Sequence, residues 1–200
     1  MPPFDLHAAT AEVARVAARV RDDQLTAPTP SVDTVATLLD HLLGLCLAFT
    51  WGAQKQEPPV GGGPGPGSAD GSRLDPGWRT ELPQRLAALA AAWDDPAAWT
   101  GEATVGGVTM PGEVTASVAL DEVVMHGWDL AVATGQEFTC DPVSAEVVLA
   151  FTAASAAPEA APMRKGLFGP VVPVPDDAPA FARALGFAGR DPAWRPPTRD

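Results

Sequence analysis

The sequence contains no tyrosine, only two cysteines and only three histidines among its 200 residues. Without tyrosine, acid–base chemistry by a phenol is excluded. The cysteines, Cys46 and Cys140, stand far apart and form no CxxC or other metal-ligand spacing, which favours a reducing compartment. An enzyme built on this chain therefore depends on carboxylates and on very few other groups.

Basic residues are also scarce. Lys and Arg number 13 against 25 Asp and Glu, so the net charge is −12 with neutral histidines. Such a surface repels phosphate backbones and anionic lipid, which argues against nucleic-acid or membrane-surface binding as the main role. Residues 1–6 lack the pattern of a secretory leader, and no apolar run approaches the roughly 18 residues of a membrane span. We expect a cytoplasmic protein.

Apolar residues recur at spacings of three and four, which predicts a mainly α-helical protein. Between residues 31 and 54, for example, Leu38, Leu42 and Leu45 fall on one stripe that suits the interior of a bundle, with Ser31 or Asp33 as N-cap. The helix over residues 112–134 is the most apolar and is expected in the centre, ending at Gly135 as C-cap. We expect the helices at residues 4–24, 31–54, 76–93, 112–134, 142–157 and 180–187.

Glycine and proline divide the chain. The pair Gly106-Gly107 between short β-prone pieces predicts a tight hairpin over residues 103–110. Residues 57–77 are rich in glycine and proline and are expected to form an exposed, flexible loop. Residues 158–200 are expected as a C-terminal extension, irregular and proline-rich up to residue 179. We expect one domain over residues 1–200.

The central helix carries a carboxylate and an imidazole one turn apart. Glu122 and His126 are four residues apart, so both side chains project from one helix face and can reach a single metal ion. The same spacing also occurs in ordinary surface ion pairs. However, a carboxylate buried in an apolar helix is costly without a cation or a proton. His41, beside the core stripe of residues 31–54, is the best candidate for a third ligand, although a histidine at the edge of a core is often only hydrogen-bonded.

Two imidazoles and one carboxylate suit a divalent ion, Zn²⁺ first, with Ni²⁺, Fe²⁺ or Mn²⁺ as alternatives. Three protein ligands leave at least one coordination position open, which is the catalytic pattern rather than the structural one. His7 has no ligand partner at helical spacing and is expected at the surface.

Other residues near the predicted site have two interpretations each. Asp129 either orients the imidazole of His126, three residues earlier, or is a polar residue near a helix end. Trp128 either lines a pocket or packs in the core. The adjacent basic residues Arg164 and Lys165 either meet a substrate carboxylate or are solvated in a loop.

Three features carry a resemblance to a known family. They are Thr29-Pro30 followed by residues 39–44 (LDHLLG), residues 122–131 with the run HGWDLA, and residues 168–175 (FGPVVPVP) together with residues 189–192 (GRDP). On these features the chain resembles the DinB/YfiT-like metalloprotein superfamily. Within it, the chain is similar to the branch of the mycothiol-dependent maleylpyruvate isomerase N-terminal domain, in an uncharacterised metal-binding subgroup.

The resemblance implies an up-and-down four-helix bundle with long connections, and a metal held by His41, Glu122 and His126. Relatives commonly have Thr-Pro-Cys and a following Trp before the ligand helix, where this chain has Ser31 and Asp33-Thr34. The C-terminal domain of the isomerase is not evident, so isomerase activity does not follow from the metal site alone.

The function expected from the sequence is that of a divalent-metal-binding bundle protein. Together with the resemblance, the site suggests a transferase or isomerase that depends on a thiol, mycothiol, and acts on a small thiol or electrophilic substrate at the open metal position. The alternative is a non-catalytic metal- or ligand-binding accessory protein of the same fold. Many relatives pack bundles together, so a homodimer is an option that the sequence leaves open.

Overall fold

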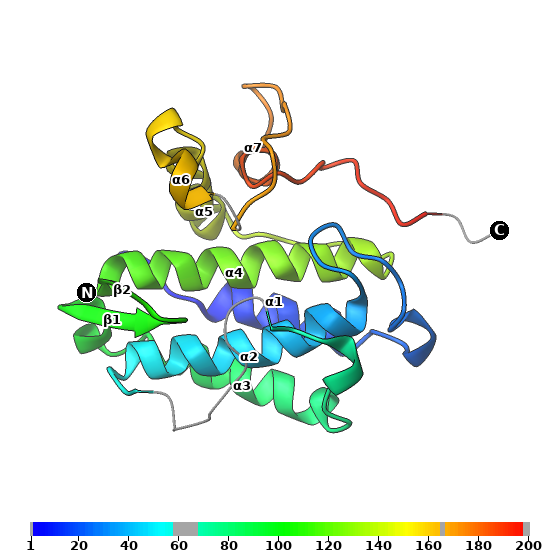
Figure 1. The fold of residues 1–200 in the computed structure, drawn as a ribbon, viewed down its shortest axis with the longest axis horizontal. Helices are drawn as coiled ribbons and strands as arrows, with labels where there is room; N and C mark the ends of the chain where they lie inside the picture. The colour runs from blue at the N-terminus through cyan, green and yellow to red at the C-terminus, as the bar shows by residue number, and fades with distance from the viewer. Residues whose placement is uncertain (1, 58–67, 165–166, 198–200) are drawn as a thin grey trace.

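The computed structural model describes residues 2–57, 68–164 and 167–197, and it is mainly helical with one small hairpin, as the sequence predicts (Figure 1). The helices and strands are α1 (His7–Ala17), α2 (Val35–Ala53), α3 (Trp78–Ala92), β1 (Glu102–Val105), β2 (Val108–Pro111), α4 (Gly112–Ala133), α5 (Pro142–Ser155), α6 (Ala161–Arg164) and α7 (Ala180–Phe187). Short 3₁₀ turns lie at Asp22–Gln24, Gly71–Arg73, Pro96–Trp99 and Pro158–Ala160.

Helices α1 to α4 form a bundle around one apolar core. α1 packs against α3 and α4, and α2 packs against the same two helices, so the four stand at the corners of a square. α4 is central, because it also contacts the hairpin and α5. Its side chains Leu120, Val123 and Leu130 are fully buried, as expected for a helix that is apolar on most faces.

Neighbouring helices of the bundle differ in whether they run parallel or antiparallel to each other. Trp78, at the start of α3, and Thr37, at the start of α2, line one cavity, so both helices begin at the same end. α4 begins at the opposite end, since a Cβ added to Gly52 near the end of α2 would meet Thr115 in the first turn of α4 at 3.9 Å. α2 and α3 therefore run parallel to each other, and α4 runs antiparallel to α2 (Figure 1).

The predicted turns and caps around α4 are confirmed. β1 and β2 pair antiparallel, and Gly106 and Gly107 turn between them with φ of 59° and 81°, which residues with a Cβ rarely adopt. Gly135 ends α4 with a φ of 70°, and the Gln136 N–H donates to the Ala131 carbonyl.

Several predicted boundaries are wrong. α1 ends at Ala17 rather than near Gln24, because the chain turns there and buries Val20 against the core without further helix. The N-cap of α2 is Thr34, whose hydroxyl accepts from the Thr37 N–H, and not Ser31 or Asp33. α5 ends at Ser155 rather than near Ala157.

The loop expected at residues 57–77 is only partly described, since residues 58–67 lie outside the described residues. Residues 68–77 include the 3₁₀ turn Gly71–Arg73, which packs on the first turn of α2. The backbone N–H of Asp70 donates to Asp40 Oδ2 at 2.9 Å.

The C-terminal extension forms a second layer. α5 packs on α4 and on α7, and this layer lies on the side of α4 away from α2 and α3 (Figure 1). The stretch 158–179 is not wholly irregular, as it contains α6.

By length and composition α2 alone among the described helices is apolar enough to cross a membrane, with a mean hydropathy of 1.4, but half of that stretch is buried inside the protein. The core helix of a soluble protein passes the same test.

Candidate metal centre

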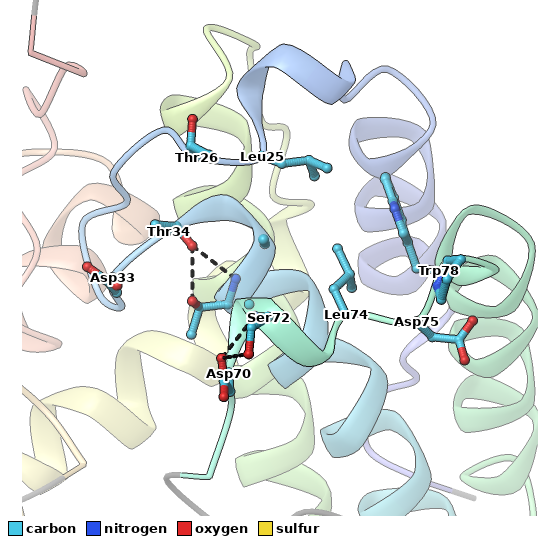
Figure 2. A pocket seen from close by; sticks show the side chains of 13 residues that line it. Leu25, Thr26, Asp33, Thr34, Asp70, Ser72, Leu74, Asp75 and Trp78 are labelled. Atoms are coloured by element: carbon cyan, nitrogen blue, oxygen red, sulfur yellow. Dashed lines mark hydrogen bonds between the residues drawn. The ribbon is translucent and has the colours of Figure 1, made fainter.

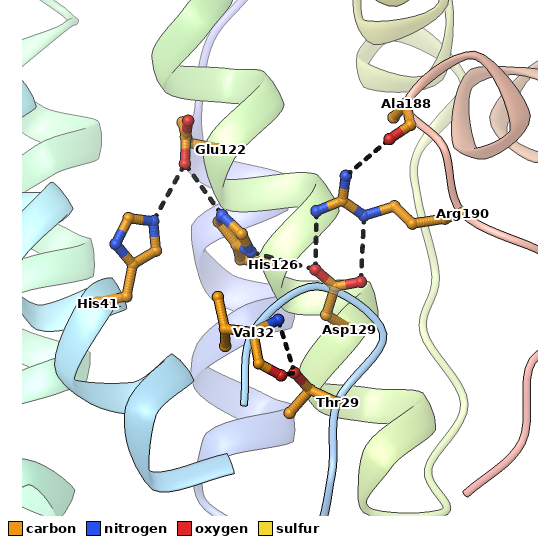
Figure 3. Close-up of polar contacts among 8 residues, drawn as sticks. All are labelled: Thr29, Val32, His41, Glu122, His126, Asp129, Ala188 and Arg190. Carbon is orange, nitrogen blue, oxygen red and sulfur yellow. Dashed lines mark hydrogen bonds and ion pairs between the residues drawn. The ribbon is translucent and has the colours of Figure 1, made fainter. Parts of the chain in front are cut away.

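Side chains from α2 and α4 meet where these helices pack together. His41 Nε2 lies 3.4 Å from Glu122 Oε2, and His126 Nε2 lies 3.1 Å from the same oxygen (Figure 3). The rings of His41 and His126 stand edge to face, with centroids 4.7 Å apart. One ligand atom from each residue lies within 4.8 Å of the other two. The structure thus brings together the three residues that the sequence singled out, including the one from a separate helix.

The distances from Glu122 to the two imidazoles fit a divalent ion. Coordination bonds of about 2.0 to 2.2 Å place neighbouring ligand atoms of a tetrahedral or octahedral ion about 3.0 to 3.5 Å apart. The distances from Glu122 Oε2 to the two imidazole nitrogens, 3.4 Å and 3.1 Å, fall in that range. Imidazole and carboxylate are also the donors that zinc and other first-row divalent ions take.

Glu122 is held as a carboxylate. Burial raises its pKa, but hydrogen bonds from His126 and His41 outweigh burial and keep the pKa well below the ordinary value. The side chains of Glu122 and His41 are 28% and 27% exposed, whereas that of His126 is 12% exposed. Solvent therefore reaches the cluster from the side of His41 and Glu122.

His126 interacts through both ring nitrogens. Nε2 faces Glu122, and Nδ1 lies 3.1 Å from Asp129 Oδ2. Burial lowers the pKa of His126, but the hydrogen bonds to Asp129 and Glu122 outweigh it and raise the pKa to about 9. A proton on His126 thus balances the charge of Glu122, and a metal ion would replace that proton.

Asp129 is fully buried and is paired with Arg190 from the C-terminal extension. Arg190 Nη2 donates to Asp129 Oδ2 at 2.9 Å, and Nε donates to Oδ1 at 3.1 Å (Figure 3). Burial raises the pKa of Asp129, but the positive charge of Arg190 and the hydrogen bonds from His126 and Arg190 together outweigh burial and lower the pKa below its ordinary value. Of the two interpretations of Asp129, the geometry favours the one in which it orients His126.

Sequence reasoning missed two residues here. Arg190 was not predicted because no fixed spacing links residue 190 to residue 129; the only signal is that a buried Asp requires a cation. Asp121, beside Glu122, is 3% exposed, and its Oδ1 has no hydrogen-bond partner among the described residues. Burial and the nearby charge of Glu122 raise the pKa of Asp121 to about 8, so this carboxyl is mainly protonated at neutral pH.

The other candidates lie elsewhere. Trp128 is 6% exposed and belongs to the hydrophobic core. His7 is exposed, and its Nε2 pairs with Asp94 at 2.9 Å. Arg164 donates to the backbone carbonyls of Gly169 and Phe187, so it fastens the extension, and Lys165 lies outside the described residues.

A separate cavity of about 490 Å³ lies where the first turns of α2 and α3 meet (Figure 2). Leu25, Leu74 and Trp78 line it together with Asp33 and Asp75. None of the three clustered ligand residues lines this cavity.

The comparison with known proteins gives a family match and two relatives. Residues 6–131 match the model of the mycothiol maleylpyruvate isomerase N-terminal domain. The relatives are Uncharacterized protein MT0763 of Mycobacterium tuberculosis strain CDC 1551 / Oshkosh and Uncharacterized protein Rv0738 of strain ATCC 25618 / H37Rv. Each is 31% identical to this chain over 182 residues, which is 88% of the chain and 91% of the relative. The search of solved structures gave no significant match.

Proposed function

Since the chain belongs to the mycothiol maleylpyruvate isomerase N-terminal domain family, within the DinB/YfiT-like superfamily, we propose that it binds a divalent metal and catalyses a transferase or isomerase reaction that depends on the thiol mycothiol. The observation that carries the proposal is the meeting of His41, Glu122 and His126, with ligand atoms within 4.8 Å of one another. Mycothiol is proposed as the thiol because the family is named for it.

The three side chains would hold the ion through the atoms that face one another. These are Nε2 of His41, Nε2 of His126 and Oε2 of Glu122. Zinc is the first choice for these donors, with nickel, iron or manganese as alternatives. When bound, the ion supplies an open coordination position at which the pKa of a water or thiol is lowered.

The protein groups prepare the site for this chemistry. Asp129 Oδ2 accepts a hydrogen bond from Nδ1–H of His126, so the lone pair of Nε2 would be the one available to the ion. Glu122 contributes one negative charge, so the centre keeps a net positive charge that attracts a thiolate. The partial exposure of His41 and Glu122 provides the side from which a small thiol or electrophile approaches. The proposal places the protein in the cytoplasm, where a low-molecular-weight thiol stays reduced.

Metal content is the first test. The protein is purified without a histidine tag, and bound metal is measured by mass spectrometry for wild type, His41→Ala and His7→Ala. We expect about one divalent ion per chain in wild type and in His7→Ala, because the side chain of His7 is exposed and pairs with Asp94, away from the cluster. His41→Ala is expected to lose most of it. Absence of stoichiometric metal from wild type would refute the proposal.

Catalysis is tested separately. Wild type and His41→Ala are incubated with mycothiol and a panel of small electrophiles and cis-unsaturated acids, and loss of substrate is followed. Turnover that requires both the thiol and His41 supports the enzyme. If metal binds but thiol-dependent turnover is equal in the two proteins, the catalytic part fails and the non-catalytic metal-binding role remains.

A further inference from the structure

The C-terminal extension reaches the rear of the metal centre through one side chain. Arg190 spans from residues beyond α7 to Asp129 on α4 and makes a bidentate pair with its carboxylate. The third guanidinium nitrogen, Nη1, donates to the Ala188 carbonyl at 3.2 Å. Arg190 is 8% exposed and all its nitrogens are engaged, so it is not available to bind a substrate.

The backbone around Arg190 is fixed by close packing of two segments of the extension. Gly189 has a φ of 81°, and a Cβ there would meet the backbone carbonyl carbon of Gly169 at 2.8 Å. The N–H of Arg190 donates to the Leu185 carbonyl at 2.8 Å. Arg164 donates to the carbonyl of Gly169 from the other side. Gly189 therefore packs against Gly169 next to Arg190. This contact joins residues 168–175 and 189–192, the two segments that carry part of the family resemblance.

The ion pair with Arg190 fixes the orientation of the Asp129 carboxylate toward His126. Two N–H groups hold the carboxylate in one orientation, in which Oδ2 accepts from both Arg190 Nη2 and His126 Nδ1. A ring whose Nδ1 proton is engaged in this way offers only Nε2 to an ion. Nε2 is the nitrogen that lies beside Glu122. The chain of contacts from Arg190 through Asp129 to His126 is continuous.

We infer that Arg190 is a positioning residue of the metal centre, which selects Nε2 of His126 as the metal-binding nitrogen by holding Asp129 in place. The inference rests on the proposed metal-binding function. It extends the centre beyond the family-matched segment, which ends at residue 131. The extension is then part of the site and not merely a cover for α4.

Zinc affinity is the primary test. It is measured by competition with a chromophoric chelator for wild type, Arg190→Gln, Arg190→Lys and Arg195→Gln. Loss of a group that orients a ligand typically weakens metal binding about 10- to 100-fold, and we expect this for Arg190→Gln. Arg190→Lys retains the charge without the fork of donors and is expected to lie between Arg190→Gln and wild type. Arg195 lies in the same tail but is exposed, and among the described residues its side chain donates to the Trp194 carbonyl and not to Asp129, so Arg195→Gln should bind zinc as wild type does.

Two further measurements separate positioning from stability. The double variant Asp129→Asn/Arg190→Gln leaves no unpaired charge at this buried pair, so we expect it to fold even if Arg190→Gln does not, and to show the same loss of affinity. In the zinc-loaded proteins, ¹⁵N spectra of the imidazoles should show His126 bound through Nε2 in wild type, and a mixed or exchanging ring in the folded variant.

The outcomes distinguish the inference from its premise. If wild type binds no zinc, the proposed function fails. If wild type binds zinc, but the folded Arg190 variants match its affinity and its ring nitrogen and lose only thermal stability, Arg190 is merely structural and the inference is wrong.

Discussion

Glu122 Oε2 lies 3.4 Å from His41 Nε2, although the two residues are 81 positions apart in the chain. This contact joins the two helices that carry the candidate centre. It distinguishes the cluster from a simple ion pair within α4, because a helix-surface pair of Glu122 and His126 would not require an imidazole from α2. Predictions about metal binding follow from it directly.

Replacing the carboxylate should abolish tight metal binding. Glu122→Gln keeps the shape of the side chain but removes its charge, so we predict a loss of zinc affinity of about a hundredfold or more, at least as large as for groups behind the ligands. Calorimetric titration measures it. Glu113→Gln, an exposed change in the first turn of the same helix, is the control and should bind zinc normally. Equal affinities in the two variants would contradict the assignment of Glu122.

Removing metal should lower thermal stability. An ion that binds only the folded state stabilises it by about 2.7 kcal/mol at a free concentration one hundred times Kd. We therefore predict that the melting temperature of wild type rises with added zinc and falls after chelation, as followed by circular dichroism. His41→Ala should melt at one temperature under all three conditions. A melting temperature of wild type that does not respond to zinc would count against a folded-state site.

Metal binding should release a proton near neutral pH. In the metal-free protein the pKa of His126 is raised to about 9, so its Nε2 is mainly protonated at pH 7 and must lose the proton to bind an ion. The apparent affinity should therefore rise with pH, up to about tenfold per unit below pH 9. Calorimetry in two buffers of different ionisation enthalpy counts the released protons. Heats that are independent of the buffer would show that His126 is already neutral.

Neither cysteine should act as a reactive thiol. Burial raises the pKa of Cys46 and of Cys140 to about 12, and neither forms a disulfide. We predict that native protein at pH 7.5 reacts slowly with Ellman's reagent and that both thiols react at once after denaturation. Rapid modification of the native chain would show a thiolate in the protein. Slow modification is consistent with a thiol supplied by a small molecule.

Close packing beside His126 should be sensitive to one added methyl group. A Cβ on Gly127 would lie 2.5 Å from Val13 Cγ2 and 2.7 Å from Phe138 Cε2, so the side chains of Val13 and Phe138 would have to shift. We predict that Gly127→Ala costs about 1 to 3 kcal/mol of the free energy of unfolding in urea. Ser117→Ala, at a partly exposed position of α4, serves as the matched change and should cost less.

Periodicity predicts much of this fold because burial of one helix face is a local property of the sequence. The apolar stripes of α2 and α4 predict both helices. Gly135 predicts the end of α4, and the Gly106-Gly107 pair predicts the turn of the hairpin. The four-residue spacing of Glu122 and His126 is also a local property, and it predicts that both side chains lie on one face of α4. The end of α1 was not predictable, because Val20 continues the helical stripe in sequence but reaches the core through a turn.

The partner of Asp129 depends on how distant segments pack, which periodicity does not report. Arg190 stands in a stretch rich in glycine and proline, and its guanidinium becomes relevant only once residues 168–175 and 189–192 meet behind α4. His41 can be predicted as a ligand because it is a polar residue within an apolar helical pattern. Arg190 lies in a segment without such a pattern, so its position alone does not mark it. The sequence signal for such a partner is an acidic residue on a core helix, because burial requires a basic partner and this chain has few Lys and Arg residues.

The position of α4 between the bundle and the C-terminal layer bears on how this chain is divided. A chain shortened to the family-matched segment would expose the fully buried Asp129 carboxylate to water on the face that α5 and α7 now cover. It would also uncover the part of α4 on which α5 packs, and newly exposed apolar surface promotes association between chains. In this protein the family match therefore ends at residue 131, inside α4, and this helix lies between two packed layers rather than at the edge of one.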